Sequence, residues 1–533
     1  MTEESPKSFF DSRTISATIL IAATFLGWQY YMQKKYPDAF KRKAAVTQVT
    51  SSAEAGGPST AENLPASTSK DAATIKKVQA PSLQEVFRFD SSTMAFELSS
   101  NGMGLRDVIL KRYNDRGGAP VELGHPEPQA LALETRPLGQ TEPLSFKIEK
   151  INPNMYVGRA SLGGVEITKT MEIDPEKYVI RYKISTSGRD DRFVGLTTFL
   201  TEEVQANDKP NLLLPQFAKQ EFYVDSGDKR DRVVFAKENI EKAWTAARIA
   251  SVGSQYFTQT VVDNSAITPE AKAKLDFASK HADLTLVYPV LNRGADFKLD
   301  YLAYVGPKSH TLLTSVDPNL AKVVDFGFFD MIGRQILSML RWFYSLVGNW
   351  GLAIILLTIL VRMMVLPFNI YSYKSMKAMQ AIQPQIQALR EKYKDDQQAQ
   401  QVEMMRLMKD HKVNPIGGCL PVFLQFPIFI ALYQVLGNSI ELYQAPFMLW
   451  IHDLSLKDPY YILPVFMGVT MFIQQKITPN TMDPAQAKVL LMMPLIFTVF
   501  MVSLPSGLTL YMLVGAVFSV LQQLYFMREK KKV

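Results

Sequence analysis

The sequence places one arginine inside a stretch that is otherwise apolar enough to cross a bilayer. Residues 349–369 read NWGLAIILLTILVRMMVLPFN, and Arg362 lies 12 positions after Trp350. At about 1.5 Å per residue of helix, the guanidinium lies about 18 Å along the span. A charge at that depth costs about 2.5–3.5 kcal/mol on insertion scales, so a helix keeps it only with water, a partner or a function.

Other polar side chains predict what surrounds this arginine. The sequence contains five other apolar stretches that are long enough, or nearly so, to cross a bilayer, and none of them contains Asp or Glu. A buried salt bridge to Arg362 is therefore disfavoured. Thr358 lies one turn before Arg362 on the same helix face, and Gln425 and Tyr511 lie inside two further apolar runs. These residues predict a hydrated cavity that holds a positive charge. The alternative is snorkelling, because Arg362 precedes Pro367 by little more than one turn and its head could reach the headgroups.

Six apolar stretches qualify, or come close, as the roughly 20-residue spans that a bilayer requires. They cover 15–32, 350–368, 417–437, 460–474, 489–504 and 508–526. Four of the five tryptophans lie at or near their ends, as in an interfacial aromatic belt. No small-x-small cleavage site follows the first stretch, so we expect an uncleaved anchor over 14–33 rather than a signal peptide.

The basic residues of the short loops predict the orientation. The segment 371–412 carries eight Lys and Arg, whereas the loop 443–459 has only Lys457. Two lysines mark 476–488, and four basic residues end the chain. This alternation predicts a cytoplasmic N-terminus (1–13) and C-terminal tail (527–533), with 84–320 outside. The basic residues of 34–43 outnumber those before the first span and argue for the reverse, but the four later segments agree with one another.

The segment 84–320 reads as an exported all-β domain after a flexible, Ala-, Ser-, Thr- and Pro-rich linker over 34–83. Alternating runs such as 177–186, 282–288 and 297–305 are separated by polar turns, which is typical of an antiparallel sandwich. The stretch TPEAKAKLDFASKHA (268–282) predicts one inserted helix. His125, His281 and His310 have no metal-ligand spacing, and Cys419 is the single cysteine, so we expect neither a metal site nor a cofactor.

The polar segment 371–412 predicts a cytoplasmic helical hairpin. Apolar residues recur at 3-4-3-4 spacing from Met379 to Tyr393, which marks one helical stripe. Pro384 should kink the first helix or begin a new one, and Asp395–Asp396 provides a break and an N-cap before a second helix from Gln397 to about residue 412.

Three motifs resemble a known family. They are VNPIGGCLPVFLQFPIFIALYQVL (413–436), APFMLWIHDLSLKDPYYILPVFMGVTMF (445–472) and PSGLTLYMLV (505–514). They resemble the YidC/Oxa/Alb family of membrane-protein insertases, over roughly residues 326–533, and the large exported domain resembles its Gram-negative form. The resemblance implies a polytopic α-helical protein with six transmembrane helices and a five-helix insertase core (344–533), an interfacial amphipathic helix (321–343) and a periplasmic β-supersandwich.

The resemblance also implies a function and partners. The chain would help inner-membrane proteins insert, fold and assemble, alone or with the Sec translocon, without enzymatic activity. Arg362 and Thr358 match the family's groove residues, with Gln425 and Tyr511 beside them; Met512 stands where the family often has a second tyrosine. The hairpin and tail would dock the ribosome, signal recognition particle and its receptor, and anionic lipids, but no DNA. The docking residues are Lys374, Lys377, Arg390, Lys392, Arg528, Lys530, Lys531 and Lys532.

The same sequence is compatible with two other classes of protein. A solute or anion transporter would use the intramembrane arginine to bind its substrate, but it predicts an internal repeat of spans, which the sequence lacks. A membrane-anchored sugar enzyme would need a constellation of carboxylates or histidines in 84–320, and none is recognisable from the sequence. No P-loop motif is present.

Overall fold

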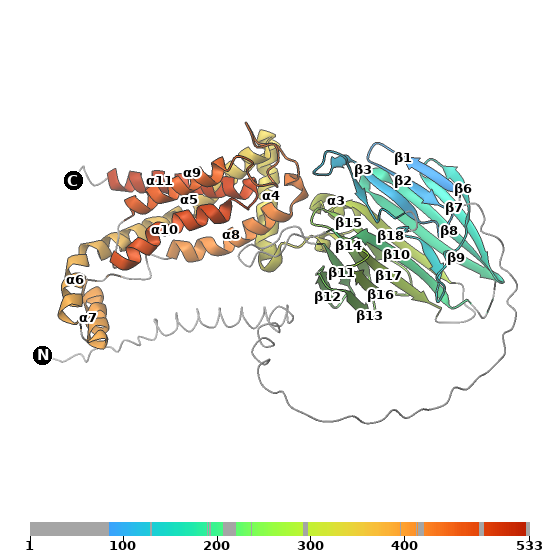
Figure 1. Cartoon of the computed structure of the whole chain (residues 1–533), viewed down its shortest axis with the longest axis horizontal. Helices are drawn as coiled ribbons and strands as arrows, with labels where there is room; N and C mark the ends of the chain where they lie inside the picture. The colour runs from blue at the N-terminus through green and yellow to red at the C-terminus, as the bar shows by residue number, and fades with distance from the viewer. Residues whose placement is uncertain are drawn as a thin grey trace, which may run out of the picture. The chain divides into compact units, whose positions relative to one another are not determined.

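The computed structural model describes residues 85–528 apart from 128–129, 189, 191–192, 206–219, 236, 291–296, 395, 412, 414–419 and 479–483. Strands occupy Val86 to Pro307, and helices follow from His310 (Figure 1). The predicted anchor (14–33), the linker (34–83) and the last three basic residues of the tail lie outside the described residues.

The described part of the β region forms three antiparallel sheets. A four-stranded sheet takes the order β1 (Val86–Asp90), β2 (Met94–Ser99), β3 (Leu105–Asn114), β4 (Pro120–Leu123). A five-stranded sheet takes the order β13 (Ile240–Trp244), β16 (Glu270–Asp276), β17 (His281–Pro289), β10 (Gly195–Glu203), β5 (Thr135–Pro137). A nine-stranded sheet takes the order β12 (Arg230–Val234), β11 (Glu221–Asp225), β14 (Ile249–Gly253), β15 (Phe257–Asp263), β18 (Lys298–Pro307), β9 (Val179–Gly188), β8 (Val165–Asp174), β7 (Met155–Leu162), β6 (Lys147–Asn152).

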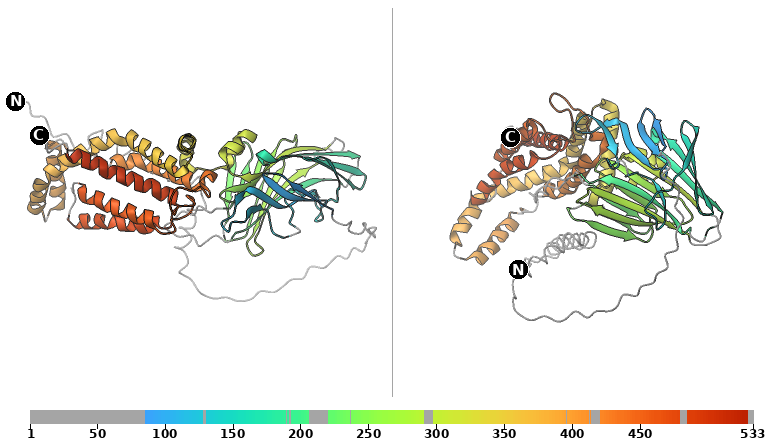
Figure 2. Two further views of the ribbon diagram at one scale, coloured as in Figure 1. Left: turned by 90° about the horizontal axis from the view of Figure 1, so that it is seen from above. Right: turned by 45° about the vertical axis from the view of Figure 1, so that its right-hand side comes forward.

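The two larger sheets pack face to face, as Figure 2 shows. Gln259 on β15 crosses between them and donates to the Glu202 carboxylate at 2.8 Å and to the Thr201 carbonyl at 2.7 Å on β10. Tyr288 on β17 and Tyr301 on β18 stack across the same interface at 6.3 Å between ring centroids. The alternation of buried and exposed residues along strands such as β8 supplies the apolar inner face. The predicted antiparallel β domain is confirmed.

The helix predicted over 268–282 is wrong. Residues Glu270–Asp276 form strand β16, which pairs with β13 and β17. The sequence EAKAKLD alternates strictly, so that Ala271, Ala273 and Leu275 face the core and the charged residues between them face solvent. Pairing on both edges of the strand and burial of this apolar row override the helix propensity of alanine, lysine and leucine.

Lys169 on β8 lies fully buried inside this domain. Its ammonium donates to the carbonyls of Gly102 and Leu133 at 2.9 Å, to that of Met103 at 3.3 Å, and to the Thr135 hydroxyl at 2.9 Å. Burial lowers the pKa of Lys169 to about 7 because the ammonium has lost its water. The lysine therefore joins the nine-stranded sheet to two loop segments from inside the core.

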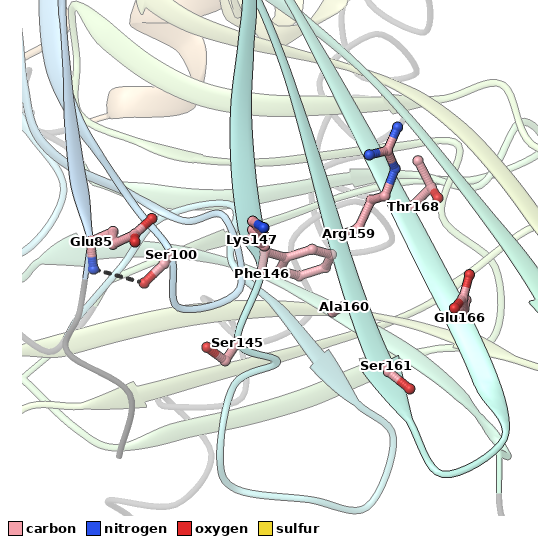
Figure 3. A pocket seen from close by; sticks show the side chains of 10 residues that line it. All are labelled: Glu85, Ser100, Ser145, Phe146, Lys147, Arg159, Ala160, Ser161, Glu166 and Thr168. Carbon is pink, nitrogen blue, oxygen red and sulfur yellow. Dashed lines mark hydrogen bonds between the residues drawn. The ribbon is translucent and has the colours of Figure 1, made fainter. Parts of the chain in front are cut away.

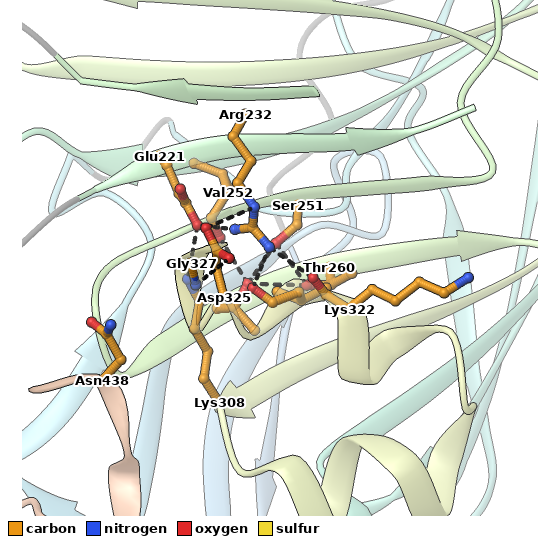
Figure 4. A network of polar contacts seen from close by, with 12 residues as sticks. Glu221, Arg232, Ser251, Val252, Thr260, Lys308, Lys322, Asp325, Gly327 and Asn438 are labelled. Carbon is orange, nitrogen blue, oxygen red and sulfur yellow. Dashed lines mark hydrogen bonds and ion pairs between the residues drawn. The ribbon is translucent and has the colours of Figure 1, made fainter. Parts of the chain in front are cut away.

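A second polar network fastens the end of the β region to the chain that leads into the helices (Figure 4). Arg232 on β12 pairs with Glu221 and lies 3.6 Å from Asp325. It also donates to the backbone carbonyls of Lys322 and Val323, at 2.7 and 3.1 Å. Lys308, which is 7% exposed, lies 3.7 Å from Glu221. These contacts fix the short turn η2 (Leu320–Val323) against the sheet.

The helical region begins with α3 (His310–Val316) and η3 (Gly327–Phe329) and continues to Arg528. The remaining helices are α4 (Asp330–Val347), α5 (Trp350–Ala381), α6 (Gln383–Lys392), α7 (Gln397–Asp410), α8 (Leu420–Asn438), η5 (Ile440–Leu442), α9 (Ile462–Ile477), α10 (Pro484–Met501) and α11 (Ser506–Arg528). Helix α11 contacts α5, α8 and α9. These helices run lengthwise beside one another in Figure 1.

The helix bounds differ from the sequence expectation in two places. The amphipathic helix expected over 321–343 begins at Asp330 and ends at Val347, because two short 3-10 turns take up the chain before it. Helix α5 runs past the predicted span to Ala381, with Pro367 inside it. By length and composition, α5 and residues 506–526 of α11 could each cross a membrane, whereas 462–477 and 491–501 are apolar but shorter.

The helical hairpin follows its local signals. Helix α6 begins at Gln383 with Pro384 in its first turn, as the sequence predicts. Asp396 caps α7, and its carboxylate accepts from the Ala399 N–H at 2.9 Å. The hairpin has a separate small core of three buried residues with four partly buried ones against them: Ile382, Ile386, Val413, Met379, Met404, Leu407 and Met408.

Candidate functional site

Arg362 lies in the middle of α5 with no carboxylate beside it in the described part of the chain. The helix is positioned at its start by Asn349, whose side-chain oxygen accepts from the Leu352 N–H at 3.0 Å and whose amide donates to the Phe447 carbonyl at 2.9 Å. Arg362 is half-buried, and its Nε is buried without a hydrogen-bond partner. A buried donor without a partner costs about 1–3 kcal/mol. The Arg362 Nε–H group therefore remains available to bind a group from outside the described residues.

Helix α11 meets this arginine through a glycine. A Cβ built on Gly515 would lie 2.4 Å from Arg362 Nη2 and 3.1 Å from Nε. The guanidinium therefore lies against the α11 backbone in space that any larger residue would take. The sequence reasoning missed Gly515; a glycine in the middle of an apolar span is the signal that could have found it, because small residues mark close approach between membrane helices.

Gln425 and Tyr511 are brought together. Gln425 on α8 donates from Nε2 to the Tyr511 hydroxyl on α11 at 2.6 Å, and its Oε1 is buried without a partner. Tyr511 is 1% exposed and lies one helical turn before Gly515. Met512 is partly buried against the apolar core instead. Thr358 is fully buried, and its hydroxyl donates at 2.6 Å to the Ile354 carbonyl of its own helix. Three helices thus contribute polar groups to this part of the bundle.

Comparison with known proteins identifies the family. A family model described as "60Kd inner membrane protein" matches residues 342–533, and one described as "YidC periplasmic domain" matches residues 87–339. A "Membrane protein insertase YidC" from Nitratidesulfovibrio vulgaris (strain DP4) is 34% identical, covering 97% of this chain and 99% of the relative. The chain belongs to the YidC family of membrane protein insertases. It is an inner-membrane insertase with a periplasmic domain, which sets aside the transporter and the sugar enzyme.

Further matches agree with this assignment or add little to it. The insertase from Marinobacter nauticus is 43% identical over 57% of this chain and 54% of that protein. A crystal structure described as an active YidC insertase with its first transmembrane domain resolved covers 82% of this chain and 93% of its own, at 18% identity and a TM-score of 0.38. A putative aldose 1-epimerase from Escherichia coli K12 covers 42% of this chain and 99% of its own, at 6% identity and a TM-score of 0.31. Both scores are too low to bear on the fold.

The loop 443–461 ties several helix ends of the insertase together. Asp458 is 1% exposed; its carboxylate accepts from the Trp450 indole at 3.0 Å and from the backbone N–H groups of Tyr460 and Leu463 at 3.0 and 2.7 Å. The first residues of α11 bind the same loop, because the Ser506 and Gly507 N–H groups donate to the carbonyls of Leu456 and Leu454. The loop therefore closes one end of the bundle.

The loop 443–461 contacts the N-terminal end of α5. The basic residues of the hairpin that are expected to dock partners lie toward the C-terminal end of α5 and on α6. Lys374 lies on the distal part of α5, and Arg390 and Lys392 lie in the last turn of α6. Lys392 lies over the Tyr393 ring, 5.4 Å from its centroid. Arg528 ends α11. Lys374 and Lys377 thus lie on α5, and Arg390 and Lys392 lie on the next helix, α6.

The periplasmic domain contains a cavity of about 460 Å³ (Figure 3). Most of its lining residues are polar or charged, and they carry charges of both signs: Glu85, Ser100, Ser145, Phe146, Lys147, Arg159, Ala160, Ser161, Glu166 and Thr168. None of these ten is a histidine.

Elsewhere in the domain, His125 and His281 stack with their ring centroids 3.6 Å apart, although 155 residues separate them in the sequence. Their spacing in the sequence is not that of metal ligands and gave no indication of this contact.

Proposed function

We propose that Arg362 is the fixed positive charge of a hydrated groove between α5, α8 and α11, which receives the polar exported tail of a nascent membrane protein. The observation that carries this proposal is the absence of an ion-pair partner for Arg362 among the described residues, although it lies half-buried in an apolar helix. The Gln425–Tyr511 hydrogen bond and the unpaired Gln425 Oε1 support a polar surface nearby.

The groove lowers two barriers to insertion. A polar tail that crosses bare hydrocarbon loses its water, which is costly for each unpaired polar group. A groove that admits water from one side shortens the dry path, and a positive charge attracts carboxylates of the tail more strongly in a low dielectric than in water. The apolar segment of the substrate then moves into lipid, and burial at about 25 cal/mol per Å² drives that step without a nucleotide.

The experiment compares Arg362→Lys and Arg362→Ala with the wild-type insertase at matched protein levels. The substrates carry acidic or neutral exported tails on one apolar segment. Arg362→Lys should retain most insertion, because charge matters more here than a bidentate fork. Arg362→Ala should lose acidic-tail substrates first, while its folding changes little, because removing an unpaired charge relieves a desolvation cost.

A matched control is Met363→Ala, since Met363 is the next residue of α5 and is 53% exposed. This variant should insert both kinds of substrate normally. Equal loss of acidic and neutral tails in Arg362→Ala would refute direct attraction of the tail.

We further propose six transmembrane helices with both termini in the cytoplasm, supported by the loop charges. The segments would be 1–13, the anchor 14–33, the linker 34–83, the periplasmic domain 84–320, the amphipathic segment 321–343 and the core 344–533. In a Cys419→Ser background, Glu85→Cys should react with an impermeant thiol reagent in intact cells whose outer membrane is permeabilised. Labelling that requires lysis of the inner membrane would contradict this topology.

The specific partners are proposals of the same kind. The hairpin 371–412 and the tail 527–533 would dock the ribosome and the signal recognition particle with its receptor, and their basic side chains would also favour anionic lipids. We also propose cooperation with the Sec translocon, which only the resemblance to the family supports. Reversing the charges of Lys374 and Lys392 should weaken ribosome cosedimentation at low salt, and a matched Lys298→Glu change in the periplasmic domain should not.

A further inference from the structure

We propose that His125, Glu127 and His281 form a binding site for a divalent transition metal ion of the Zn²⁺ class in the periplasmic domain. One ligand atom from each side chain can be chosen so that all three lie within 4.8 Å of one another. Two imidazoles and one carboxylate are a ligand set that zinc uses, with the fourth position left to water or another donor. This site shares no residue with the proposed groove or with the cavity of Figure 3.

The backbone holds the three side chains at one point. His125 and Glu127 lie on the short segment after β4, with Pro126 between them fixing its own φ. His281 is the first residue of β17 and is paired in register with Glu203 of β10. The Glu203 N–H donates to the Gly124 carbonyl at 3.2 Å, which fastens the β4 segment to the end of the same sheet. The ligands therefore come from two segments that are already joined.

The second observation is an unpartnered buried nitrogen. His125 is 9% exposed, and its Nε2 is buried with no hydrogen-bond partner. An imidazole nitrogen left in this way costs stability unless it serves a ligand. His281 Nε2 lies 3.3 Å from the Glu127 carboxylate. Glu203 and Asp283 add negative charge around the pair, which favours a cation.

Loading the site requires two adjustments. The rings stack with their planes 12° apart, so a metal ion cannot lie in the plane of both until one ring turns. The His281 side chain is 22% exposed and is the ring that we expect to turn. His125 Nδ1 accepts from the Glu127 N–H at 3.2 Å, and that long bond is given up when the proton moves to Nδ1 and Nε2 binds the metal. Donors in a tetrahedral zinc site lie about 3.3–3.6 Å apart, so side-chain rotation suffices.

The test measures Zn²⁺ and Co²⁺ binding to the full-length insertase in detergent, purified without a polyhistidine tag and freed of metal by a chelator. We expect one Zn²⁺ per chain by calorimetry and visible d–d absorption on adding Co²⁺. His281→Ala and the near-isosteric Glu127→Gln should each weaken Zn²⁺ binding at least tenfold. His452→Ala is the control, because His452 is an exposed histidine of the helical region. Thermal melts of each variant without metal verify that it is folded.

Two results would overturn the proposal. Zn²⁺ binding that is unchanged in both folded variants would place the ion elsewhere. Absence of one-to-one binding in the wild type would leave the histidine pair a stacking contact only. Mg²⁺ and Ca²⁺, which prefer oxygen ligands, should bind at least a hundredfold more weakly than Zn²⁺, and equal binding of all three would also refute a nitrogen-ligand site.

Discussion

The Asp458→Asn substitution tests whether one buried carboxylate holds the loop 443–461 closed. One carboxylate oxygen of Asp458 accepts from the Trp450 indole and the Tyr460 N–H, and the other accepts from the Leu463 N–H. Asparagine has nearly the same size but offers one acceptor and one donor. In either orientation of the amide, its NH₂ group faces at least one N–H group, and no rotation restores all three bonds.

The expected loss follows from these contacts. A hydrogen bond to a charged acceptor contributes about 1.5–3 kcal/mol, and the buried N–H left behind costs about 1–3 kcal/mol. The two contributions overlap because they describe the same donor, so we expect about 3 kcal/mol of local destabilisation. Since each 1.4 kcal/mol is a factor of ten, the loop should open about 100- to 200-fold more often.

Hydrogen exchange measures this opening directly. The Ser506 and Gly507 amides donate to the carbonyls of Leu456 and Leu454 at 2.6 and 2.9 Å, so their exchange reports whether the loop is docked. In Asp458→Asn, a peptide covering these amides should exchange about 100-fold faster, while peptides of the periplasmic domain keep their rates. Lys457→Gln changes an exposed charge in the same loop and should leave exchange unaltered.

Two outcomes would refute this reasoning. Unchanged exchange at 506–507 in a folded Asp458→Asn protein would show that the carboxylate does not hold the loop. Equal acceleration in Lys457→Gln would assign the effect to loop charge rather than to the three hydrogen bonds. If the loop does seal one end of the bundle, vesicles that contain Asp458→Asn should also leak protons faster than vesicles with the control variant.

Three further predictions concern Gly515, Lys169 and Glu202. Gly515→Ala should fold but displace the Arg362 guanidinium, reducing insertion of acidic-tail substrates several-fold, and adding Arg362→Lys should restore part of it; additive losses would contradict a shared space. Lys169→Met should lower the free energy of unfolding by about 3 kcal/mol in denaturant titrations, because the Met103 and Leu133 carbonyls lose the buried ammonium that donates to them. Burial raises the pKa of Glu202 to about 7, above its unfolded value near 4.3, so the stability that it contributes is present at low pH and lost as the pH rises through 7. Glu202→Gln should therefore stabilise the protein at pH 8, by on the order of 3 kcal/mol at most, and much less at pH 5; the same gain at both pH values would rule out titration of this carboxyl.

Local signals predicted local structure well in the hairpin. Pro384 and Asp396 each have a mechanism that acts within one helical turn, and the structure begins α6 and caps α7 at these residues. The same kind of reasoning failed for 268–282, because helix propensity is a weak preference. Pairing along both edges of β16 is a long-range effect that the sequence of one segment does not contain.

The candidate site was predictable as a set of residue types but not as a geometry. An arginine in an apolar span is visible in the sequence, since the cost of burying it does not depend on the fold. Its neighbour Gly515 is 153 positions away, and Gln425 meets Tyr511 over 86 positions. The stacked pair of His125 and His281 is separated in the same way. Contacts of this range follow from helix packing and strand order, which one sequence does not specify.

The hairpin's separate core makes the hairpin mechanically independent of the other helices. Among the described residues, Ile382, Ile386 and Val413 form a cluster apart from the one that runs through the membrane helices. Three buried side chains stabilise such a unit only weakly, so it should unfold and refold on its own while the spans stay packed. A protease that cuts the turn between α6 and α7 would therefore leave the membrane bundle whole. Sequence changes in the hairpin can likewise accumulate without a cost to the packing of α5, α8 and α11.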